Sequence, residues 1–166
     1  MRKKLTYLVF PFLIIISQSL WGTVYYVDAT QGNDSNNGTS PATAWRTISR
    51  VSNAMGAFRA GDQILFQRGE TWTDSELYIS CSGTNGNPII FADYGSGAKP
   101  TISRTYRGIV SEALIHDVTI RNFHVTGSTR NGITFNSGAG FRYRINVEYC
   151  DVDNVGNNGI YVDQTD

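Results

Sequence analysis

The feature that constrains this chain most is a repeat with a period of 27 residues near its end. Residues 118–135 align without a gap on residues 145–162, and apolar positions fall on apolar positions. The matched pairs are Val118 with Ile145, Ile120 with Val147, Phe123 with Cys150, Val125 with Val152, Ile133 with Ile160 and Phe135 with Val162. Two Asn-Gly turns also coincide, at Asn131 and Asn158. Such turns recur by chance in turn-rich sequence, but the concurrent apolar matches argue against chance.

A period in the twenties with several short strands per repeat predicts a solenoid. A leucine-rich repeat has a similar period, but its Leu-rich consensus is absent here. We therefore predict an all-β fold, a right-handed parallel β-helix, in which each strand lies parallel to its equivalent in the next coil. Matching residues then stack, apolar ladders form the core, and Asn131 and Asn158 form an amide ladder at a turn.

The chain before the coils carries one helix pattern. Its apolar residues recur at spacings of three and four: Trp45, Ile48, Val51, Met55 and Phe58. Ser40-Pro41 is a start signal and Gly56 a stop signal. Because the first coil of a solenoid has an open apolar end, we expect this amphipathic helix to cap that end.

Three segments follow from these patterns. Residues 1–22 combine a basic start, a short apolar run and small residues, which indicates a secretory signal peptide cleaved after Ser19 or Gly22. A membrane anchor is the alternative, although the apolar run is short for a bilayer span. Residues 23–60 form an N-terminal strand, loop and capping helix, and residues 61–166 form the coils. We expect a bacterial protein that is secreted or lies at the cell surface, without stable membrane insertion.

Charge and cysteine usage narrow the function classes. Without residues 1–22 the chain has 11 Lys and Arg against 14 Asp and Glu, a net charge of −3. This mildly acidic balance gives no support for nucleic-acid binding. Cys81 and Cys150 would pair in an oxidising compartment, but both lie in strand-like apolar contexts, and we favour free thiols.

The polar stretch around Asp34 resembles a calcium loop at first sight. An EF-hand loop needs oxygen ligands at alternate positions and a distal Glu. Asp34, Asn36 and Gly38 supply too few carboxylates, and no Glu follows before Glu70. We interpret this stretch as a loop that leads into the capping helix.

The carboxylates that suggest a metal site lie in the last coil. Strand alternation turns Asp151 and Asp153 outward, over His124 and Thr126 of the preceding coil. With Asp163 or Glu148 nearby, these side chains predict a calcium site formed by Asp151, Asp153 and Asp163. The alternative is that charges on an outer strand face only solvate it and protect it from aggregation.

Basic residues offer few candidates for a catalytic base. Lys99 is the only lysine outside residues 1–22, and it lies in a turn between coils. Four arginines lie nearer the coils, and most of them fit solvated edge charges: Arg121, Arg130, Arg142 and Arg144. His116 and His124 have no partner evident in the sequence for nucleophilic or zinc chemistry. The catalytic residues therefore stay unknown, and no cofactor other than calcium is indicated.

Several short motifs together suggest a family. They are Tyr25-Tyr26-Val27-Asp28, Gly32-Asn33-Asp34, Gly38-Thr39-Ser40-Pro41, Trp45-Arg46-Thr47-Ile48, Gly61-Asp62-Gln63-Ile64, Phe66, Gly69, Trp72, Ser82-Gly83-Thr84, Pro88-Ile89 and Tyr94-Gly95. With the coil repeats, they make the chain resemble the N-terminal part of secreted bacterial right-handed parallel β-helix proteins. It is most similar to the polysaccharide-lyase group, which includes pectate lyases and chondroitinase-B-like or alginate lyases.

This resemblance implies an enzyme that cleaves uronate-containing glycans by β-elimination, with calcium on the uronate carboxylate and a Lys or Arg base. An acidic polysaccharide is then the expected partner of a monomeric protein. Two alternatives stay open: a non-enzymatic surface β-helix that binds carbohydrate or acts as an adhesin, and a glycoside hydrolase on the same scaffold. Because the sequence stops directly after a strand, we expect a truncated chain whose catalytic coils lie beyond Asp166.

Overall fold

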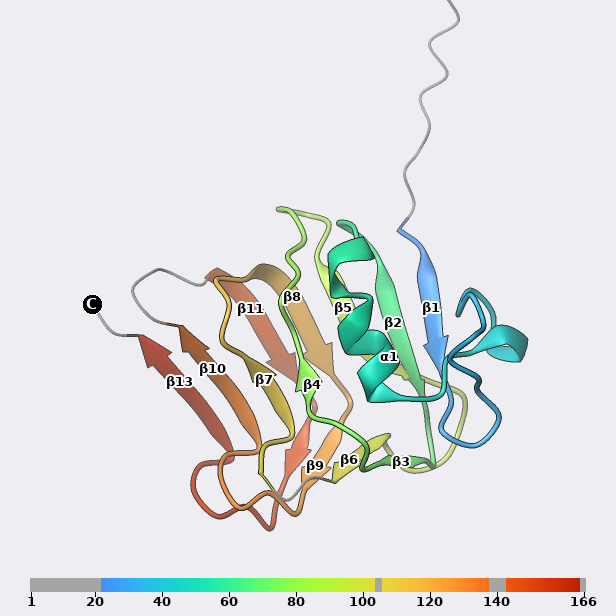
Figure 1. The fold of residues 1–166 in the computed structure, drawn as a ribbon. Helices are drawn as coiled ribbons and strands as arrows, with labels where there is room; N and C mark the ends of the chain where they lie inside the picture. Colours follow the sequence, from blue (N-terminus) through green and yellow to red (C-terminus); the bar gives the residue numbers. More distant parts are fainter. Residues whose placement is uncertain (1–21, 104–105, 138–142, 165–166) are drawn as a thin grey trace, which may run out of the picture.

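The computed structural model describes residues 22–103, 106–137 and 143–164. Over these ranges the protein is a parallel β-helix in which three sheets run side by side along one axis (Figure 1). Of the predicted signal peptide, residues 1–22, only Gly22 is described, and Arg142 also lies outside the described residues. Within the described ranges, no helix has the length and apolar character needed to span a bilayer.

Each sheet collects one strand from each successive coil, and neighbouring strands in all three sheets are parallel. Sheet A runs in the order β1 (Val24–Val27), β2 (Gln63–Gln67), β5 (Ile89–Tyr94), β8 (His116–Arg121) and β11 (Tyr143–Glu148). Sheet B contains β3 (Thr71–Trp72), β6 (Thr101–Ser103), β9 (His124–Thr126) and β12 (Asp151–Val152). Sheet C contains β4 (Leu77–Tyr78), β7 (Ile109–Ser111), β10 (Ile133–Ser137) and β13 (Ile160–Gln164). The predicted parallel β-helix is confirmed.

The 27-residue alignment is the register of the last two coils. Val118 pairs with Ile145 in sheet A, Val125 with Val152 in sheet B, and Ile133 with Ile160 in sheet C. The sequence alignment matched Phe123 with Cys150. The backbone N–H of the following residue, Asp151, donates to the carbonyl of Phe123 at 2.8 Å, as this alignment requires.

Inward side chains stack into ladders that form the core. The ladders are Ile64–Phe91–Ile120–Val147 in sheet A, Trp72–Ile102–Val125–Val152 in sheet B and Leu77–Ile109–Ile133–Ile160 in sheet C. The members in the earlier coils are almost fully buried. Burial of this kind contributes about 1.5–3 kcal/mol for each large apolar side chain, so the ladders are the main source of stability.

The corners of the coils also repeat with the same period. At three positions, equivalent residues of successive coils have positive φ: Asp117 and Arg144 near the start of β8 and β11, Asn122 and Tyr149 after these strands, and Gly127 and Asn154 beyond β9 and β12. Four of these six are Gly, Asn or Asp, the residue types that tolerate positive φ best. Arg144 and Tyr149 are not of these types, and they hide the repeat of positive φ in the sequence.

The predicted Asn ladder takes a different form. The side-chain oxygen of Asn131 accepts a hydrogen bond of 3.0 Å from the backbone N–H of Asn158, one coil later. The amide therefore bonds the next turn's backbone rather than the next side chain, and it ties two coils together at the entrance to sheet C.

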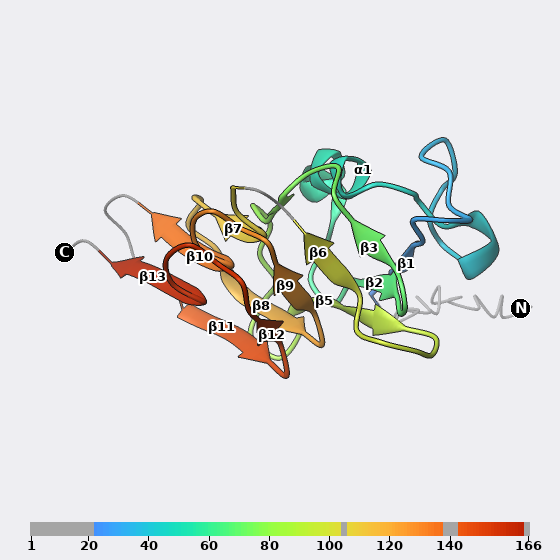
Figure 2. The same ribbon diagram turned by 90° about the horizontal axis from the view of Figure 1, so that it is seen from below.

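The helix lies within the predicted segment but is shorter than predicted. α1 covers Ile48–Asn53, between two short 3-10 turns, η1 (Pro41–Thr43) and η2 (Met55–Ala57). Ile48 and Val51 are fully buried, and α1 packs beside β4, the first strand of sheet C, so it forms the third wall of the first coil and covers this end of sheet C (Figure 1). Figure 2 shows that the loop carrying η1 lies beyond β1, at the N-terminal end of the stack.

The loop before α1 explains why the helix begins late. Asp34 accepts hydrogen bonds from the backbone N–H of Arg46 at 2.8 Å and of Thr47 at 3.0 Å, and from the Thr47 hydroxyl at 2.7 Å. Thr47 in turn caps α1 by accepting from the N–H of Arg50 at 3.0 Å. Burial acts to raise the pKa of Asp34, but the hydrogen bonds from Thr47 and Arg46 outweigh it and lower that pKa. Asp34 thus fixes the loop to the helix start.

Trp45, predicted to lie on the helix, precedes it. It forms a parallel bridge with Val27, and its ring stacks on Tyr25 with centroids 5.0 Å apart. Its indole N–H donates to the carbonyl of Asn36 at 3.0 Å. The aromatic side chain therefore joins the loop to the first strand of sheet A.

Cys81 and Cys150 are both free thiols, as predicted.

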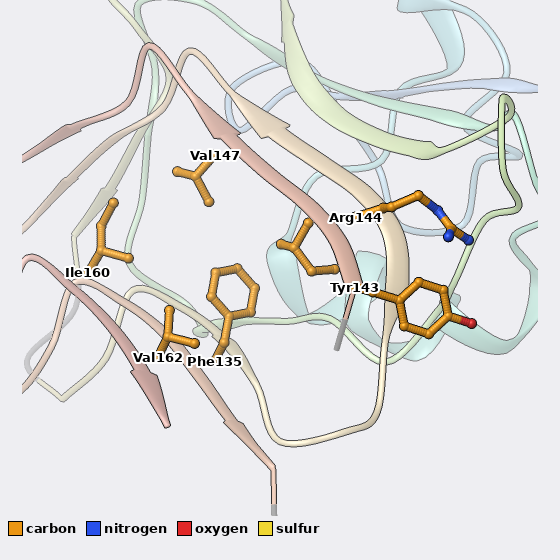
Figure 3. A pocket seen from close by; sticks show the side chains of 7 residues that line it. Phe135, Tyr143, Arg144, Val147, Ile160 and Val162 are labelled. Atoms are coloured by element: carbon orange, nitrogen blue, oxygen red, sulfur yellow. The ribbon is translucent and has the colours of Figure 1, made fainter. Parts of the chain in front are cut away.

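At the other end of the stack, the apolar core faces a hollow of about 340 Å³. Figure 3 shows Phe135, Val147, Ile160 and Val162 around it, with the Arg144 side chain directed away from them. Ile160 is 51% exposed and Val162 54%, whereas Phe135 in the preceding coil is 3% exposed. The lining of this hollow continues the core ladders, so the hollow belongs to the core and is not a candidate ligand site.

Candidate functional site

The outer face of sheet B carries the polar cluster that the sequence singled out. Figure 2 shows β6, β9 and β12 following one another along the stack. Thr101, His124 and Asp151 occupy equivalent positions on these strands, and their side chains form one outward row. An open hollow of about 440 Å³ lies over this face and is lined by Ala98, Lys99, Thr101, His124, Asp151 and Asp153.

Lys99 belongs to this face, although it follows a turn between coils. Its Nζ lies 2.8 Å from Oδ2 of Asp151 and donates to the carbonyl of Tyr149 at 2.7 Å. The Asp151 side chain is 63% exposed, so the ion pair is open to solvent and contributes little to stability. The Asp151 carboxylate is open to a ligand and the Lys99 side chain is partly exposed, and both line the hollow.

Asp153 is held by two side chains of the preceding coil. The Thr126 hydroxyl donates to Oδ1 at 2.6 Å, and Nε2 of His124 lies 3.0 Å from Oδ2. The hydrogen bonds from Thr126 and then His124 lower the pKa of Asp153. This carboxyl is therefore ionised at neutral pH, where it accepts hydrogen bonds and does not act as a proton donor.

The third predicted carboxylate lies on another sheet. Asp163 is in β13, paired in register with Asn136 of sheet C, while Asp151 and Asp153 belong to sheet B. The described residues contain no group of three His, Cys, Asp or Glu side chains placed to hold a metal ion. The donor set predicted for calcium is thus not assembled, because the chain turns a corner between Asp153 and Asp163.

His116 has a partner that the sequence did not reveal. Its Nδ1 lies 2.8 Å from Asp117, and its ring stacks on Tyr143 with centroids 4.9 Å apart. Arg144 binds the same carboxylate through Nε and, at 2.7 Å, through Nη2. The guanidinium of Arg144, with the His116 hydrogen bond, lowers the pKa of Asp117 to about 2, although burial acts to raise it. The cluster joins two coils through a buried carboxylate.

The remaining predicted candidates are dispersed. Arg121 and Glu148 pair in register at the ends of β8 and β11 in sheet A. Arg130 precedes β10, near the turn of Asn131 and beside the ring of Tyr106 at 5.4 Å. Neither Arg121 nor Arg130 lines the hollow over sheet B.

The sheet B face combines two exposed carboxylates, a lysine, a histidine and threonine hydroxyls. Asp151 and Asp153 are two residues apart along an extended segment, which separates their Cα atoms by about 6.6 Å. Such alternating donors and acceptors match the hydroxyl groups of a sugar chain. The pairing of His124 with Asp153 follows from the register, whereas nothing in the sequence indicates the contact of Lys99 with Asp151.

Comparison with known proteins finds proteins of similar sequence and fold. No family model matches the chain. It is 33% identical over 85 residues to a lacto-N-biosidase of Bifidobacterium longum subsp. longum. That likeness covers 49% of this chain and 5% of the relative, so the chain spans a small part of the relative's length.

Solved structures share the fold at low identity. A GH136 lacto-N-biosidase from Eubacterium ramulus superposes with a TM-score of 0.67 at 23% identity, covering 84% of this chain and 30% of that one. Pectate lyase Pel9A superposes with a TM-score of 0.51 at 20% identity, covering 81% of this chain and 45% of that one. Both likenesses support a parallel β-helix.

Proposed function

We propose that this protein is a secreted, carbohydrate-processing β-helix protein that binds a glycan across the outer face of sheet B. The observation that carries the proposal is that Lys99, His124, Asp151 and Asp153 together line an open hollow. The likeness to lacto-N-biosidase and to pectate lyase supports carbohydrate as the ligand class.

Two reaction classes compete, and each has a feature in its favour. Glycoside hydrolysis uses two carboxyl groups that flank the scissile bond, and Asp151 and Asp153 stand as neighbours on one face. β-Elimination on a uronate needs a base and a group that neutralises the sugar carboxylate, and Lys99 is the cation of this hollow. Calcium takes no part in the proposal, since Asp163 lies apart from the other two carboxylates.

The two classes differ in their products. The full chain is incubated with a panel of neutral oligosaccharides and of uronate-containing polysaccharides, and new reducing ends are measured together with ultraviolet absorbance of unsaturated uronate. Hydrolysis gives reducing ends alone, whereas elimination gives both. Binding without either product assigns the chain to the non-enzymatic alternative.

The location of the site is tested by substitution. Asp153→Asn and His124→Ala each remove charge or hydrogen-bonding capacity from the outer face, and we expect either to weaken glycan binding by about tenfold, the size of a hydrogen bond to a charged group. Glu148→Gln on sheet A is the matched control and should bind as the parent chain does. Unchanged binding by both sheet B variants, or no binding to any glycan in the panel, contradicts the proposal.

A further inference from the structure

A second polar groove lies on sheet C, outside the site described above. It has a volume of about 310 Å³ and is formed by the turns that lead into β7, β10 and β13 and by the outer faces of β10 and β13. Tyr106 and Tyr161 supply aromatic rings, while Arg130, Asn131 and Asn158 supply planar polar groups. We call it the sheet C groove.

The turns that form the groove are hydrogen-bonded from one coil to the next. The N–H of Arg130 donates to the carbonyl of Tyr106 at 3.1 Å, and the N–H of Asn157 donates to the carbonyl of Arg130 at 3.3 Å. The Asn131 side chain accepts from the N–H of Asn158 at 3.0 Å, which leaves its NH₂ group for another partner. These bonds fix the positions of the groups that line the groove.

An unpartnered hydroxyl at the base of the groove points to a ligand. Thr134 lines the groove between Val110 and Tyr161 of the neighbouring strands and is 3% exposed. Among the described residues, its Oγ1 is one of four buried side-chain oxygen atoms that have no hydrogen-bond partner. Buried polar groups are nearly always paired, so a hydroxyl without a partner next to a polar groove calls for one from outside the chain.

The charges around the groove select a neutral ligand. Arg107 is already bound by two carboxylates, Glu76 at 3.0 Å and Glu112 at 2.6 Å. Arg130 has no ion-pair partner among the described residues and is held only against Tyr106. With Glu76 and Glu112 counted, the two guanidinium groups leave no net charge around the groove, and the unpaired one, Arg130, lies against the ring of Tyr106.

We propose that the sheet C groove binds a neutral pyranose unit of an oligosaccharide. Tyr161 and the half-exposed Tyr106 offer faces on which the C–H groups of a sugar ring stack. Arg130 and the Asn131 amide donate to its hydroxyl oxygens, and the Thr134 hydroxyl gains a partner from the sugar directly or through one water. The inference shares the ligand class with the proposed function but rests on different residues.

The test is isothermal titration of the full chain with lactose, chitotetraose and cellotetraose, and with tetragalacturonate as the acidic probe. We expect a neutral probe to bind and Tyr161→Ala to weaken it by about tenfold, the upper end for one aromatic contact. Thr134→Val should weaken it by about fivefold, the size of one hydrogen bond, without lowering the melting temperature, since the hydroxyl has no partner in the free protein. Tyr143→Ala, on sheet A, is the control and should bind normally.

The outcomes separate the two sites. Loss of binding in Asp153→Asn with normal binding in Tyr161→Ala and Thr134→Val overturns the sheet C inference and leaves the sheet B proposal standing. The reverse pattern supports the sheet C groove and removes the sheet B face as the binding site. Binding of tetragalacturonate alone, or of no probe, overturns the inference.

Discussion

Phe123 gives the sharpest test of the stacked core. It is fully buried, and its ring meets that of Phe66 edge to face with centroids 5.1 Å apart, although the two residues come from different coils. Replacing a buried Phe by Ala costs about 3–5 kcal/mol through lost burial and the cavity left behind. That is a large part of the roughly 5–15 kcal/mol that stabilises a typical domain, so Phe123→Ala should be severely destabilised.

Urea unfolding followed by circular dichroism measures this loss. Leu114→Ala is the matched control, because Leu114 is 55% exposed, and its free energy of unfolding should stay within about 0.5 kcal/mol of the parent. The milder variants Phe66→Leu and Phe123→Leu, with their double mutant, should show a coupling of about 0.5–1.5 kcal/mol. An equal loss of unfolding free energy in Phe123→Ala and Leu114→Ala would refute the packing described here. So would a double mutant whose loss is the sum of the losses in Phe66→Leu and Phe123→Leu.

Three further predictions concern single contacts. Asn131→Ala should lower the free energy of unfolding by about 1 kcal/mol, because the N–H of Asn158 loses its acceptor, and Asn157→Ala should cost less. Because Arg144 above all holds the pKa of Asp117 at about 2, stability from this pair is present above the ordinary carboxyl value of 3.8 and is lost as pH falls through about 2. As pH falls between these two values, the urea midpoint of unfolding should therefore decrease more steeply in the parent than in Arg144→Gln. The same dependence of the midpoint on pH in both proteins would contradict this. Burial raises the pKa of Cys81 to about 12 and also raises that of Cys150, so iodoacetamide at neutral pH should modify both thiols in urea and neither in the folded chain, as read by mass spectrometry.

The coil repeat could be predicted because it rests on side-chain periodicity alone. Val118 and Ile145, or Ile133 and Ile160, match in type and spacing, and the structure places them in register. The helix was predicted in the right segment but too long, since Trp45 belongs to a bridge with Val27 and the helix starts at its Thr47 cap. An apolar spacing does not show where a distant carboxylate such as Asp34 fixes the helix start.

The candidate site was predictable only within one strand. Strand alternation correctly turned Asp151 and Asp153 outward over His124 and Thr126. It did not place Asp163, because the corner after Asp153 sends the chain to sheet C. The contact of Lys99 with Asp151 joins residues more than one coil apart and depends on how the turn before β6 folds back, which local sequence does not encode.

An engineered disulfide tests the register most directly. Thr119 and Asn146 are paired on the outer face of sheet A, so their Cα atoms should be about 4.8 Å apart, within the range that a disulfide bridges. The control pairs Asn146 with Arg121, two residues out of register and about 8 Å away, which is too far. Under mild oxidation, peptide mapping should find a disulfide between the two introduced thiols in Thr119→Cys/Asn146→Cys, and free thiols at both engineered positions in Arg121→Cys/Asn146→Cys. A disulfide that forms only in the control, or equally in both variants, would show that the two repeats do not stack 27 residues apart. Both proposed binding sites would then be wrong, because each depends on residues from stacked coils.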